Sequence, residues 1–409
     1  MYDILVVGGG ASGMMAAIAA KEENVMLSVA VVERNNRVGK KILTTGNGRC
    51  NITNKNININ RYHGNNLKFA DFSLSVMNLD KTLEFFKKIG MYPKFEDDKV
   101  YPYSLQASSV VDILRLKMAE YSISEICDFK CSDIKKENDV FVIISSDNKK
   151  IKAKKVIVCC GGKASPKCGT DGNAYKFLQK FGHKCTSLYP SLVQLRSDSL
   201  HLIPMKGVKT DSLINIYVDN NYIKSEYGEL LFTDYGLSGP PIFQLSRIAS
   251  KACAENKKVF VTVDLMPEIE YDELIHALKL RNKFVPVADF LTGMLNKLLA
   301  RQILKSSGID KFNTDSKVIS DDIIVNIANC IKKWKFNIIG TNSWDMSQVT
   351  AGGIDTNDFN SKTMESKLVN GLYAAGEILD IDGDCGGFNL QWAWSSGYVA
   401  GISCAKSLE

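Results

Sequence analysis

A glycine-rich turn between a short apolar strand and an apolar helix constrains the fold of this 409-residue chain more than any other feature. Residues 3–7 (DILVV) are typical of a buried strand, and residues 11–20 have the small apolar side chains of a helix packed tightly on a sheet. Between them, Gly8, Gly10 and Gly13 form a G-x-G-x-x-G pattern. The first glycine permits a tight turn, the second lets the backbone approach a pyrophosphate, and the third allows close helix–strand packing. Free amides at the start of the helix would then hold the phosphates.

An acidic residue at the end of the second strand completes a dinucleotide-binding pattern. Residues 27–32 form that predicted strand, and Glu33 lies twenty residues after Gly13. A carboxylate at this position accepts hydrogen bonds from ribose hydroxyls, and an acid in place of a basic residue argues against NADP. FAD and NAD both satisfy the pattern, so other segments have to discriminate between them.

Two further glycine-rich segments favour FAD. Arg37–Asn54 concentrates glycine, small hydroxyls and basic side chains just after the ribose acid, where it can wrap the phosphates and reach the flavin edge. In residues 371–397 a strand ends near Glu377, and a helix begins near Gly387 or Phe388. The N-terminus of that helix would face the N1/C2=O edge of the flavin, where negative charge accumulates on reduction. Either Glu377 or Asp380 could bond the ribityl hydroxyls.

The remaining patterns before residue 190 predict further helices and strands. Helices are expected at 80–90 and at 108–121, the second capped by Ser108 or Ser109. Strands are expected at residues 128–134, 140–145, 150–153 and 156–160.

The middle of the chain interrupts the nucleotide-binding pattern. Alternating segments at 213–219, 222–226, 229–233 and 259–265 predict an antiparallel meander or barrel. Helical periodicity follows, with helices predicted over 287–304 and 321–333. We therefore predict an α/β fold with a discontinuous FAD-binding domain at 1–190 and 345–409, an inserted β-barrel substrate domain at 191–266 and 335–344, and a helical subdomain at 267–334.

Composition predicts a cytoplasmic protein with a small-molecule partner. Lys and Arg number 51 against 45 Asp and Glu, and a net charge of +6 is too small for this length to indicate a nucleic-acid partner. The 11 cysteines lack C-x-x-C pairing, as expected in a reduced compartment. Glycines interrupt the apolar N-terminal stretch, so no membrane segment is expected. The 4 histidines form no spaced pair or metal cluster, so no metal site is predicted and no catalytic base can be named. The oligomeric state stays open.

Five motifs in order resemble the HI0933-like family of FAD-dependent oxidoreductases, also called the YhiN or BaiN family. These motifs are Lys40–Asn54, Gly228–Ile242, Thr350–Ile354, Thr363–Lys367 and the C-terminal run that begins at Gly371. The resemblance implies an FAD-binding Rossmann domain of the glutathione-reductase type, with an inserted antiparallel β-barrel and a helical subdomain. Members have been assigned as aminoacetone oxidases and as reductases of unsaturated bile-acid intermediates. The chain departs from the family pattern at Asp234, where histidine is more usual, so any role for a histidine there is in doubt.

The predicted function is therefore an FAD-dependent oxidoreductase acting on a small organic substrate, with NAD(P)H as a possible transient co-substrate. Either amine oxidation with O2 or NAD(P)H-linked reduction of an activated C=C bond fits, and the alternative is a flavin-bearing sensor or an RNA-associated flavoprotein. Asp234 and Tyr235 are candidate catalytic residues, and Phe388 and Trp392 are candidates for an apolar pocket. The predicted FAD contacts are Gly8, Gly10, Ala11, Ser12, Gly13, Glu33, Arg34, Lys40, Lys41, Gly48, Arg49, Cys50, Asn51, Cys131, Gly161, Gly376, Glu377, Gly387, Phe388, Asn389 and Leu390.

Overall fold

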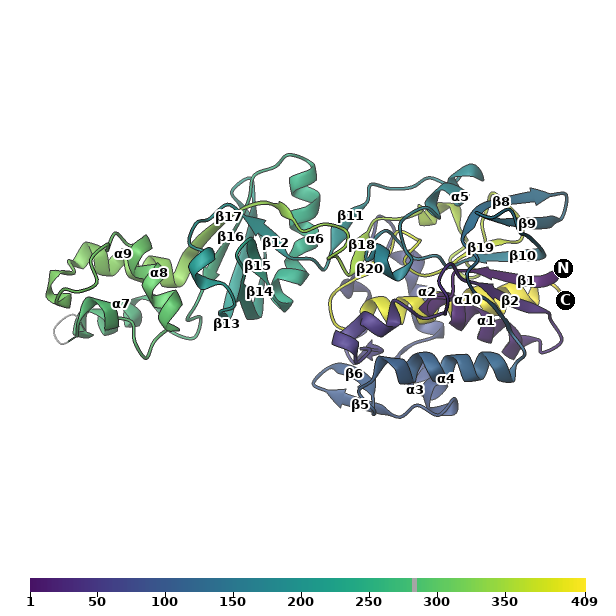
Figure 1. Cartoon of the computed structure of the whole chain (residues 1–409), viewed down its shortest axis with the longest axis horizontal. Helices are drawn as coiled ribbons and strands as arrows, with labels where there is room; N and C mark the ends of the chain where they lie inside the picture. The colour runs from purple at the N-terminus through teal and green to yellow at the C-terminus, as the bar shows by residue number, and fades with distance from the viewer. Residues whose placement is uncertain (282–284) are drawn as a thin grey trace. The chain divides into compact units, whose positions relative to one another are not determined.

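A computed structural model describes residues 1–281 and 285–409, and the chain forms two compact units (Figure 1). The first unit contains Met1–Tyr189 and Gln348–Glu409, and the second contains Pro190–Ser347. Residues 282–284, within the predicted helical subdomain, lie outside the described residues. Each unit has its own hydrophobic core.

A seven-stranded sheet forms the centre of the first unit, with the order β7-β2-β1-β10-β9-β8 and with β19 also paired to β10. Strands β7, β2, β1, β10 and β19 are parallel, whereas β9 and β8 continue antiparallel from β10. The parallel strands are rich in Val and Ile because a parallel sheet is covered on both faces. Their bounds are β1 (Tyr2–Val7), β2 (Val29–Val32), β7 (Ser124–Ile126), β8 (Cys131–Glu137), β9 (Val140–Ser145), β10 (Lys150–Val158) and β19 (Leu372–Ala374).

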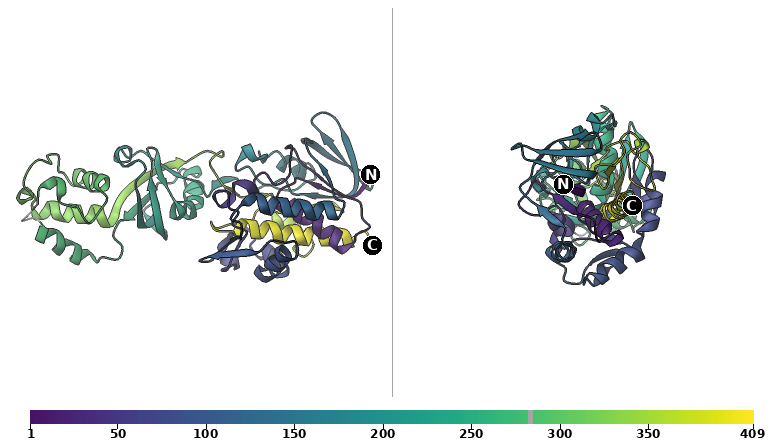
Figure 2. Two further views of the ribbon diagram at one scale, coloured as in Figure 1. Left: turned by 60° about the horizontal axis from the view of Figure 1, so that its bottom comes forward. Right: turned by 90° about the vertical axis from the view of Figure 1, so that its right-hand side faces the viewer.

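Two helices from opposite ends of the chain pack against each other in this unit (Figure 2). They are α1 (Ala11–Glu23) and α10 (Phe388–Lys406). Ser12 meets Gly397 and Ala16 meets Gly401, where an added Cβ would lie 2.4 and 2.2 Å from the facing carbonyl oxygens. Both contacts advance by four residues in the same direction, so the two helices run parallel.

The other elements of the first unit surround this sheet and helix pair. Their bounds are β3 (Thr53–Asn54), β4 (Tyr62–His63), α2 (Lys68–Val76), α3 (Leu79–Lys88), β5 (Pro93–Glu96), β6 (Lys99–Pro102), α4 (Ala107–Glu120), α5 (Tyr175–Lys180), β18 (Val349–Ala351) and β20 (Asp382–Gly383). The chain leaves this unit through β11 (Tyr189–Ser191).

The second unit contains a closed antiparallel barrel with the order β12-β15-β14-β13-β16-β17. Three helices, α7, α8 and α9, lie in sequence between β16 and β17, and α6 precedes β16. The bounds are β12 (Leu195–Ser197), β13 (Lys209–Val218), β14 (Asn221–Phe232), β15 (Gly236–Ser238), α6 (Pro240–Ala254), β16 (Val259–Asp264), α7 (Tyr271–Arg281), α8 (Lys297–Ser306), α9 (Asp321–Lys333) and β17 (Trp334–Thr341). The Rossmann-type sheet and the inserted barrel confirm the predicted fold class.

Several predicted elements have different bounds in the structure. The two strands expected at 150–160 form the single strand β10, and the two expected at 222–233 form β14. The expected cap of α4 is wrong because that helix begins at Ala107, which places both serines inside its first turn.

The helix predicted over 287–304 is also wrong. Gly293 has φ +85°, which a right-handed helix does not allow, and the side chain of Asn296 then caps α8 by accepting a hydrogen bond from the Leu298 amide. Among the described residues, no helix is both long and apolar enough to cross a membrane.

Candidate functional site

The N-terminus of α1 forms the first part of the candidate site. A Cβ at Gly13 would lie 1.9 Å from the Gly8 carbonyl oxygen, so the helix starts directly against the end of β1. The N-cap residue Gly10 has no side chain to bond the first amides, and a Cβ there would meet no atom within 4 Å. Free amides and open space at the positive end of a helix form a site for an anion. Ala11 and buried Ser12 occupy its first turn.

Glu33 lies at the end of β2, beside the glycine turn. Its Oε2 atom accepts a hydrogen bond from the Gly9 amide at 2.9 Å, and its Oε1 atom accepts from both nitrogens of Asn35 at 2.9 and 2.7 Å. The carboxylate therefore fixes the turn as well as standing where the sequence predicts a ribose contact. Its neighbour Arg34 forms an ion pair with Asp171 at 2.7 Å, and Lys40 donates to the Asn35 side chain at 3.4 Å.

The N-terminus of α10 forms the second part of the site. Because α10 begins nine residues before Gly397 and α1 begins one residue before Ser12, α10 extends eight residues further. At 1.5 Å per residue, this places the start of α10 about 12 Å beyond the start of α1, on the same side of the unit. The N-termini of α1 and α10, which both carry partial positive charge, therefore face the same side of the unit and are separated along the helix axis. This arrangement suits an elongated ligand whose anionic middle meets α1 and whose far end meets α10.

Gly387 brings the first turn of α10 against the segment that follows Cys50. It has φ +100°, and a Cβ there would lie 2.6 Å from the Thr53 carbonyl oxygen and 3.0 Å from Asn51 Oδ1. Asn51 Oδ1 is buried and has no hydrogen-bond partner among the described residues. A buried acceptor without a partner is costly, so this atom fits a site that a ligand donor completes.

The side chains of α10's first turn differ in what they can offer a ligand. Phe388 and Trp392 are both buried, and their rings pack against Tyr62 and Phe69 inside the unit; their role in an apolar pocket stays a prediction. Trp392 donates from Nε1 to the Gly376 carbonyl oxygen at 3.1 Å. Asn389 bonds both backbone groups of Gly383. The backbone amides of Phe388, Asn389 and Leu390 are therefore what this turn presents, since Gly387 offers no side-chain cap.

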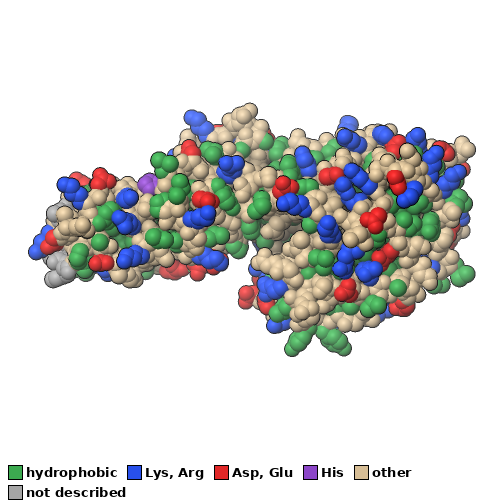
Figure 3. Space-filling view, in the orientation of Figure 1, with side chains coloured by type: hydrophobic (Ala, Val, Ile, Leu, Met, Phe, Trp, Pro, Cys, Tyr) green, Lys and Arg blue, Asp and Glu red, His purple; other side chains and the backbone are tan. Residues whose placement is uncertain are grey.

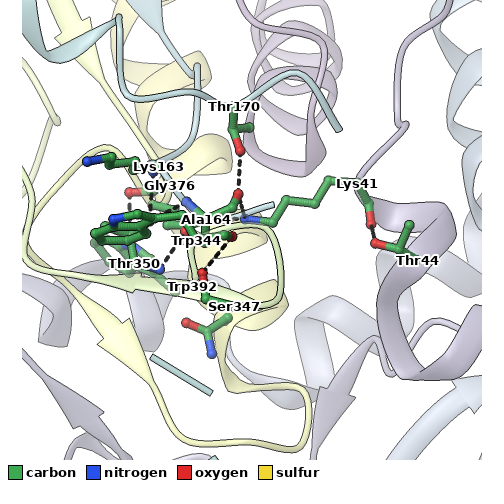
Figure 4. Close-up of polar contacts among 12 residues, drawn as sticks. Lys41, Thr44, Lys163, Ala164, Thr170, Trp344, Ser347, Thr350, Gly376 and Trp392 are labelled. Carbon is green, nitrogen blue, oxygen red and sulfur yellow. Dashed lines mark hydrogen bonds and ion pairs between the residues drawn. The ribbon is translucent and has the colours of Figure 1, made fainter. Parts of the chain in front are cut away.

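A partly buried ion pair joins segments that are far apart in sequence. Lys41 Nζ lies 2.7 Å from Glu377 Oε2, and Glu377 Oε1 accepts from the Thr350 amide at 2.8 Å. Thr350 Oγ1 in turn accepts from the amides at 163 and 164, at 2.7 and 2.9 Å. Figure 4 shows Lys41 reaching toward Ala164, whose carbonyl oxygen also accepts from Thr170 at 2.6 Å. The sequence suggests Lys41 and Glu377 separately but gives no sign that they pair.

The two carboxylates predicted to reach the ribityl hydroxyls are both engaged within the protein. Glu377 has the contacts described above, and its side chain is 19% exposed. Asp380 is buried and accepts from the Asn65 amide at 3.2 Å. Gly161 and Gly376 lie near Glu377 and Ser12 respectively.

The other predicted FAD contacts have more clearly structural partners. Arg49 pairs with Glu96 at 2.8 Å and lies over the Tyr101 ring at 4.4 Å. Burial raises the pKa of Cys50 to about 12, although a hydrogen bond with Thr45 opposes the shift, so this thiol stays protonated. Cys131 starts β8, and burial raises its pKa to about 12 as well. At Gly48 an added Cβ would meet no atom within 4 Å.

The candidate catalytic residues lie in the second unit, in the turn between β14 and β15. Asp234 pairs with Lys206 at 2.6 Å, and the hydrogen bond that Lys206 donates lowers the pKa of the Asp234 carboxyl group. The same turn is closed by Thr233, which bonds the Gly236 carbonyl oxygen through its amide and its hydroxyl. Tyr235 is partly buried.

The structure also forms a histidine–carboxylate pair that the sequence analysis missed. His63 Nε2 lies 2.8 Å from Asp384 Oδ1, although the two residues are 321 positions apart. Only the pairing of β4 with β20 brings them together, and no sequence spacing could have indicated it.

Over the whole face in Figure 3, basic and acidic side chains are interspersed, consistent with the small net charge of +6.

Comparisons with known proteins agree with this architecture. The model of the HI0933-like protein Rossmann domain matches residues 2–403. A relative from Clostridium scindens named 3-dehydro-bile acid delta(4,6)-reductase is 36% identical over 409 residues, covering 99% of this chain and 100% of the relative. A ribosomal RNA dihydrouridine synthase from Haemophilus influenzae is 28% identical over 416 residues, covering 98% of each chain.

A solved structure shares the fold. The open conformation of a flavocytochrome c3 fumarate reductase matches with a TM-score of 0.50 and 15% identity, covering 99% of this chain and 78% of that chain. At this identity the likeness concerns the fold alone.

Proposed function

The chain belongs to the HI0933-like family of FAD-dependent oxidoreductases, as its motifs predict, and from that premise we propose that it reduces a C=C bond conjugated to a carbonyl group. The proposed substrate is a small organic molecule of the unsaturated steroid-acid type, and the proposed electron donor is NADH or NADPH. The observation that carries this proposal is the match of 36% identity over the full length of a protein named as a bile-acid reductase.

The names of the two relatives point to one reaction class. The first name describes reduction of double bonds at positions 4 and 6 of a 3-dehydro bile acid, where they are conjugated with the 3-keto group, and the second describes addition of two hydrogens to a uracil double bond next to a carbonyl. Both reactions add a hydride to one carbon and a proton to its neighbour. An active site that serves either substrate needs a hydride source, a proton donor and a surface that positions the carbonyl.

The residues of the first unit fit FAD as the hydride source. The open N-terminus of α1 would hold the pyrophosphate, Glu33 the adenosine ribose, and the amides of Phe388–Leu390 the flavin edge. Asn51 Oδ1, buried without a partner among the described residues, would accept from the bound group. When bound, FAD supplies two-electron redox chemistry, and the protein orients the substrate and controls proton transfer.

An RNA substrate is the second candidate, because the Haemophilus influenzae relative matches 98% of this chain. In that case the same double-bond chemistry would act on uridine. Amine oxidation by O2 and a flavin-bearing sensor are the remaining alternatives, and each predicts a different result in the experiment that follows.

The test is anaerobic reduction of the purified holoprotein, followed by mixing with candidate oxidants. We expect NADH or NADPH to bleach the flavin absorbance, and a 3-keto-4,6-diene steroid acid to restore it faster than air does. Restoration by a uridine-containing ribosomal RNA fragment would favour the RNA substrate instead. Bleaching by amines with fast reoxidation by air would favour an amine oxidase, and failure of every donor and acceptor to turn over would overturn the proposal of an enzyme.

A further inference from the structure

His63 and Asp384 form a polarised pair at the edge of the candidate site. Asp384 follows β20 and accepts from His63 Nε2 at 2.8 Å through Oδ1. Its Oδ2 atom lies 3.2 Å from Arg61 Nε, and its amide donates to the Arg61 carbonyl oxygen at 2.9 Å. The Asp384 side chain is only 5% exposed, whereas that of His63 is 33% exposed. The buried Asp384 carboxylate therefore lies between Arg61 and His63, and it holds the His63 imidazole where a ligand can reach it.

The chemistry of this pair determines which ring nitrogen is available. An ionised carboxylate only accepts hydrogen bonds, so Nε2 of His63 carries the proton that points to Asp384. This leaves Nδ1 for a ligand, as a proton acceptor in the neutral imidazole and as a proton donor in the imidazolium. The carboxylate orients the ring and fixes which nitrogen faces the ligand, as the acid does in hydrolase triads.

Three contacts attach this pair to the first turn of α10. Tyr62, the residue before His63, donates from its hydroxyl to the Phe388 carbonyl oxygen at 3.2 Å. The guanidinium carbon of Arg61 lies 4.9 Å from the centre of the Phe388 ring. Asn389 Nδ2 donates to the Asp384 carbonyl oxygen at 3.3 Å. The histidine pair therefore sits beside the helix end that is proposed to meet the flavin edge.

We propose that His63 is the proton donor for double-bond reduction at this site and that Asp384 is its positioning residue. The inference rests on the proposed function. As a hydride adds to the carbon β to the carbonyl, the electron pair of the C=C bond moves toward the carbonyl. The α-carbon then takes a proton from Nδ1 of the His63 imidazolium. The imidazole is left neutral and regains its proton from water.

Separate half-reactions test the proton step. In His63→Gln the reduced protein should be reoxidised by the unsaturated ketone about 100-fold more slowly, the lower end of what a general acid contributes. Reduction by the nicotinamide donor and reoxidation by air need no proton from His63 and should change little. His276→Gln alters an exposed histidine of α7 and is the matched control. Equal slowing of all three reactions in His63→Gln, or no slowing, would overturn the role.

Chemical modification tests the position of His63 without turnover. Diethyl pyrocarbonate should modify His63 in the apoprotein, as peptide mass spectrometry can show. FAD together with a saturated ketone analogue should slow that modification roughly tenfold. A bound ligand buries most of its surface against the walls of its pocket, so it would shield a His63 side chain that forms part of the wall. His276 should react at the same rate throughout. Unprotected His63 would contradict its place in the site even if every unsaturated ketone failed as a substrate, whereas protected His63 without any turnover would refute the proposed function alone.

Two more variants separate proton transfer from structural support. Asp384→Asn keeps the shape of the side chain but replaces the acceptor that orients the His63 ring, so it should slow the ketone half-reaction while the KM for ketone stays similar. His63→Ala should regain part of that half-reaction when free imidazole is added. If imidazole restores nothing while FAD occupancy and Tm match the wild type, His63 is not the proton donor.

Discussion

At the scale of single residues, the structure shows one role of Glu33, in holding the glycine turn, while its contact with the ribose stays a prediction. It holds the glycine turn through the Gly9 amide and the following loop through Asn35, in addition to its predicted contact with the ribose. Substitution therefore affects both the empty site and the bound cofactor. The effect of a Glu33 substitution on FAD affinity therefore has to be compared with its effect on the stability of the glycine turn.

We predict that Glu33→Ala weakens FAD binding by roughly 10- to 100-fold. The loss of hydrogen bonds to a charged acceptor costs about 1.5 to 3 kcal/mol, and each 1.4 kcal/mol is a factor of ten. Titration of the apoprotein with FAD, followed by flavin fluorescence, measures the change. Glu84→Ala in α3, whose glutamate is exposed, is the control and should leave FAD affinity unchanged. Wild-type affinity in Glu33→Ala would refute the ribose assignment.

At the scale of elements, the start of α10 depends on one glycine for both its conformation and its fit. Gly387 adopts φ +100°, and a side chain there would meet Thr53 and Asn51. Gly90, after α3, has the same φ of +100° but has open space around the position of a Cβ. Comparing substitutions at Gly387 and Gly90 therefore distinguishes the effect of backbone strain, which both share, from the effect of crowding, which only Gly387 has.

We predict that both Gly387→Val and Gly90→Val lower stability, because a branched side chain disfavours the left-handed region by about 1 to 2 kcal/mol. Only Gly387→Val should also expel FAD or shift its redox potential, since it alone disturbs the segment around Asn51. Absorbance spectra after gel filtration and a potentiometric titration report the two effects. A normal flavin spectrum and potential in Gly387→Val would remove this turn from the site.

The junction of β1 with its neighbours contains a carboxylate whose charge stabilises the sheet. Asp3 bonds the amide and hydroxyl of Ser28 at 2.8 and 2.7 Å and pairs with Lys154 of β10 at 2.8 Å. Burial by itself would raise the pKa of Asp3, but the hydrogen bonds from Lys154 and Ser28 outweigh it and lower the pKa to about 2.

We predict that Asp3→Asn lowers the free energy of unfolding by about 1 to 2 kcal/mol at pH 7, after allowance for partial exposure. Because the pKa of Asp3 is lower in the folded chain than in the unfolded chain, its contribution is complete above the unfolded value near 4. It disappears as the pH falls through about 2. Urea unfolding between pH 2 and 7 should therefore show the full difference at pH 7 and the variant and the wild type converging below pH 4. Asp112→Asn, at an exposed carboxylate, should show little difference from the wild type at any pH.

At the scale of the whole molecule, the second unit interrupts a nucleotide-binding unit that has its own core. A large insertion without a nucleotide motif is suited to substrate binding, and a role for its turn at 234–235 in the substrate reaction stays a prediction. The exposed pair of Asp234 with Lys206 is equally suited to holding the turn.

We predict that Asp234→Ala and Tyr235→Phe slow one half-reaction by about tenfold, equivalent to about 1.4 kcal/mol, while FAD occupancy and Tm stay at wild-type values. Stopped-flow reduction and reoxidation measure this effect. Lys206→Gln removes the ion partner alone, so an equal effect in that variant would assign the change to the turn. Unchanged half-reactions in both Asp234→Ala and Tyr235→Phe would exclude these residues from the pocket.

The sequence by itself determined the features that depend on local chemistry. The glycine turn of α1, the acid after β2, the start of α10 at Phe388 and the bounds of α9 all follow from neighbours within a few residues. The family motifs supplied the cofactor class in the same way. The start of α8 was predicted wrongly although its signal is local: Asn296 caps the helix by accepting a hydrogen bond from the Leu298 amide, so α8 begins at Lys297.

Only the tertiary structure decided which polar groups meet across the chain. Lys41 pairs with Glu377 over 336 positions, and His63 pairs with Asp384 over 321. The pairing of β4 with β20 brings His63 beside Asp384, and both ion pairs are long-range contacts that form only in the folded chain. The spacing of residues along the sequence does not indicate which residues more than 300 positions apart come into contact. The charges that surround the candidate site are therefore a property of the fold, whereas the glycine turn and the acid after β2, which predict a cofactor site, are already evident in the sequence.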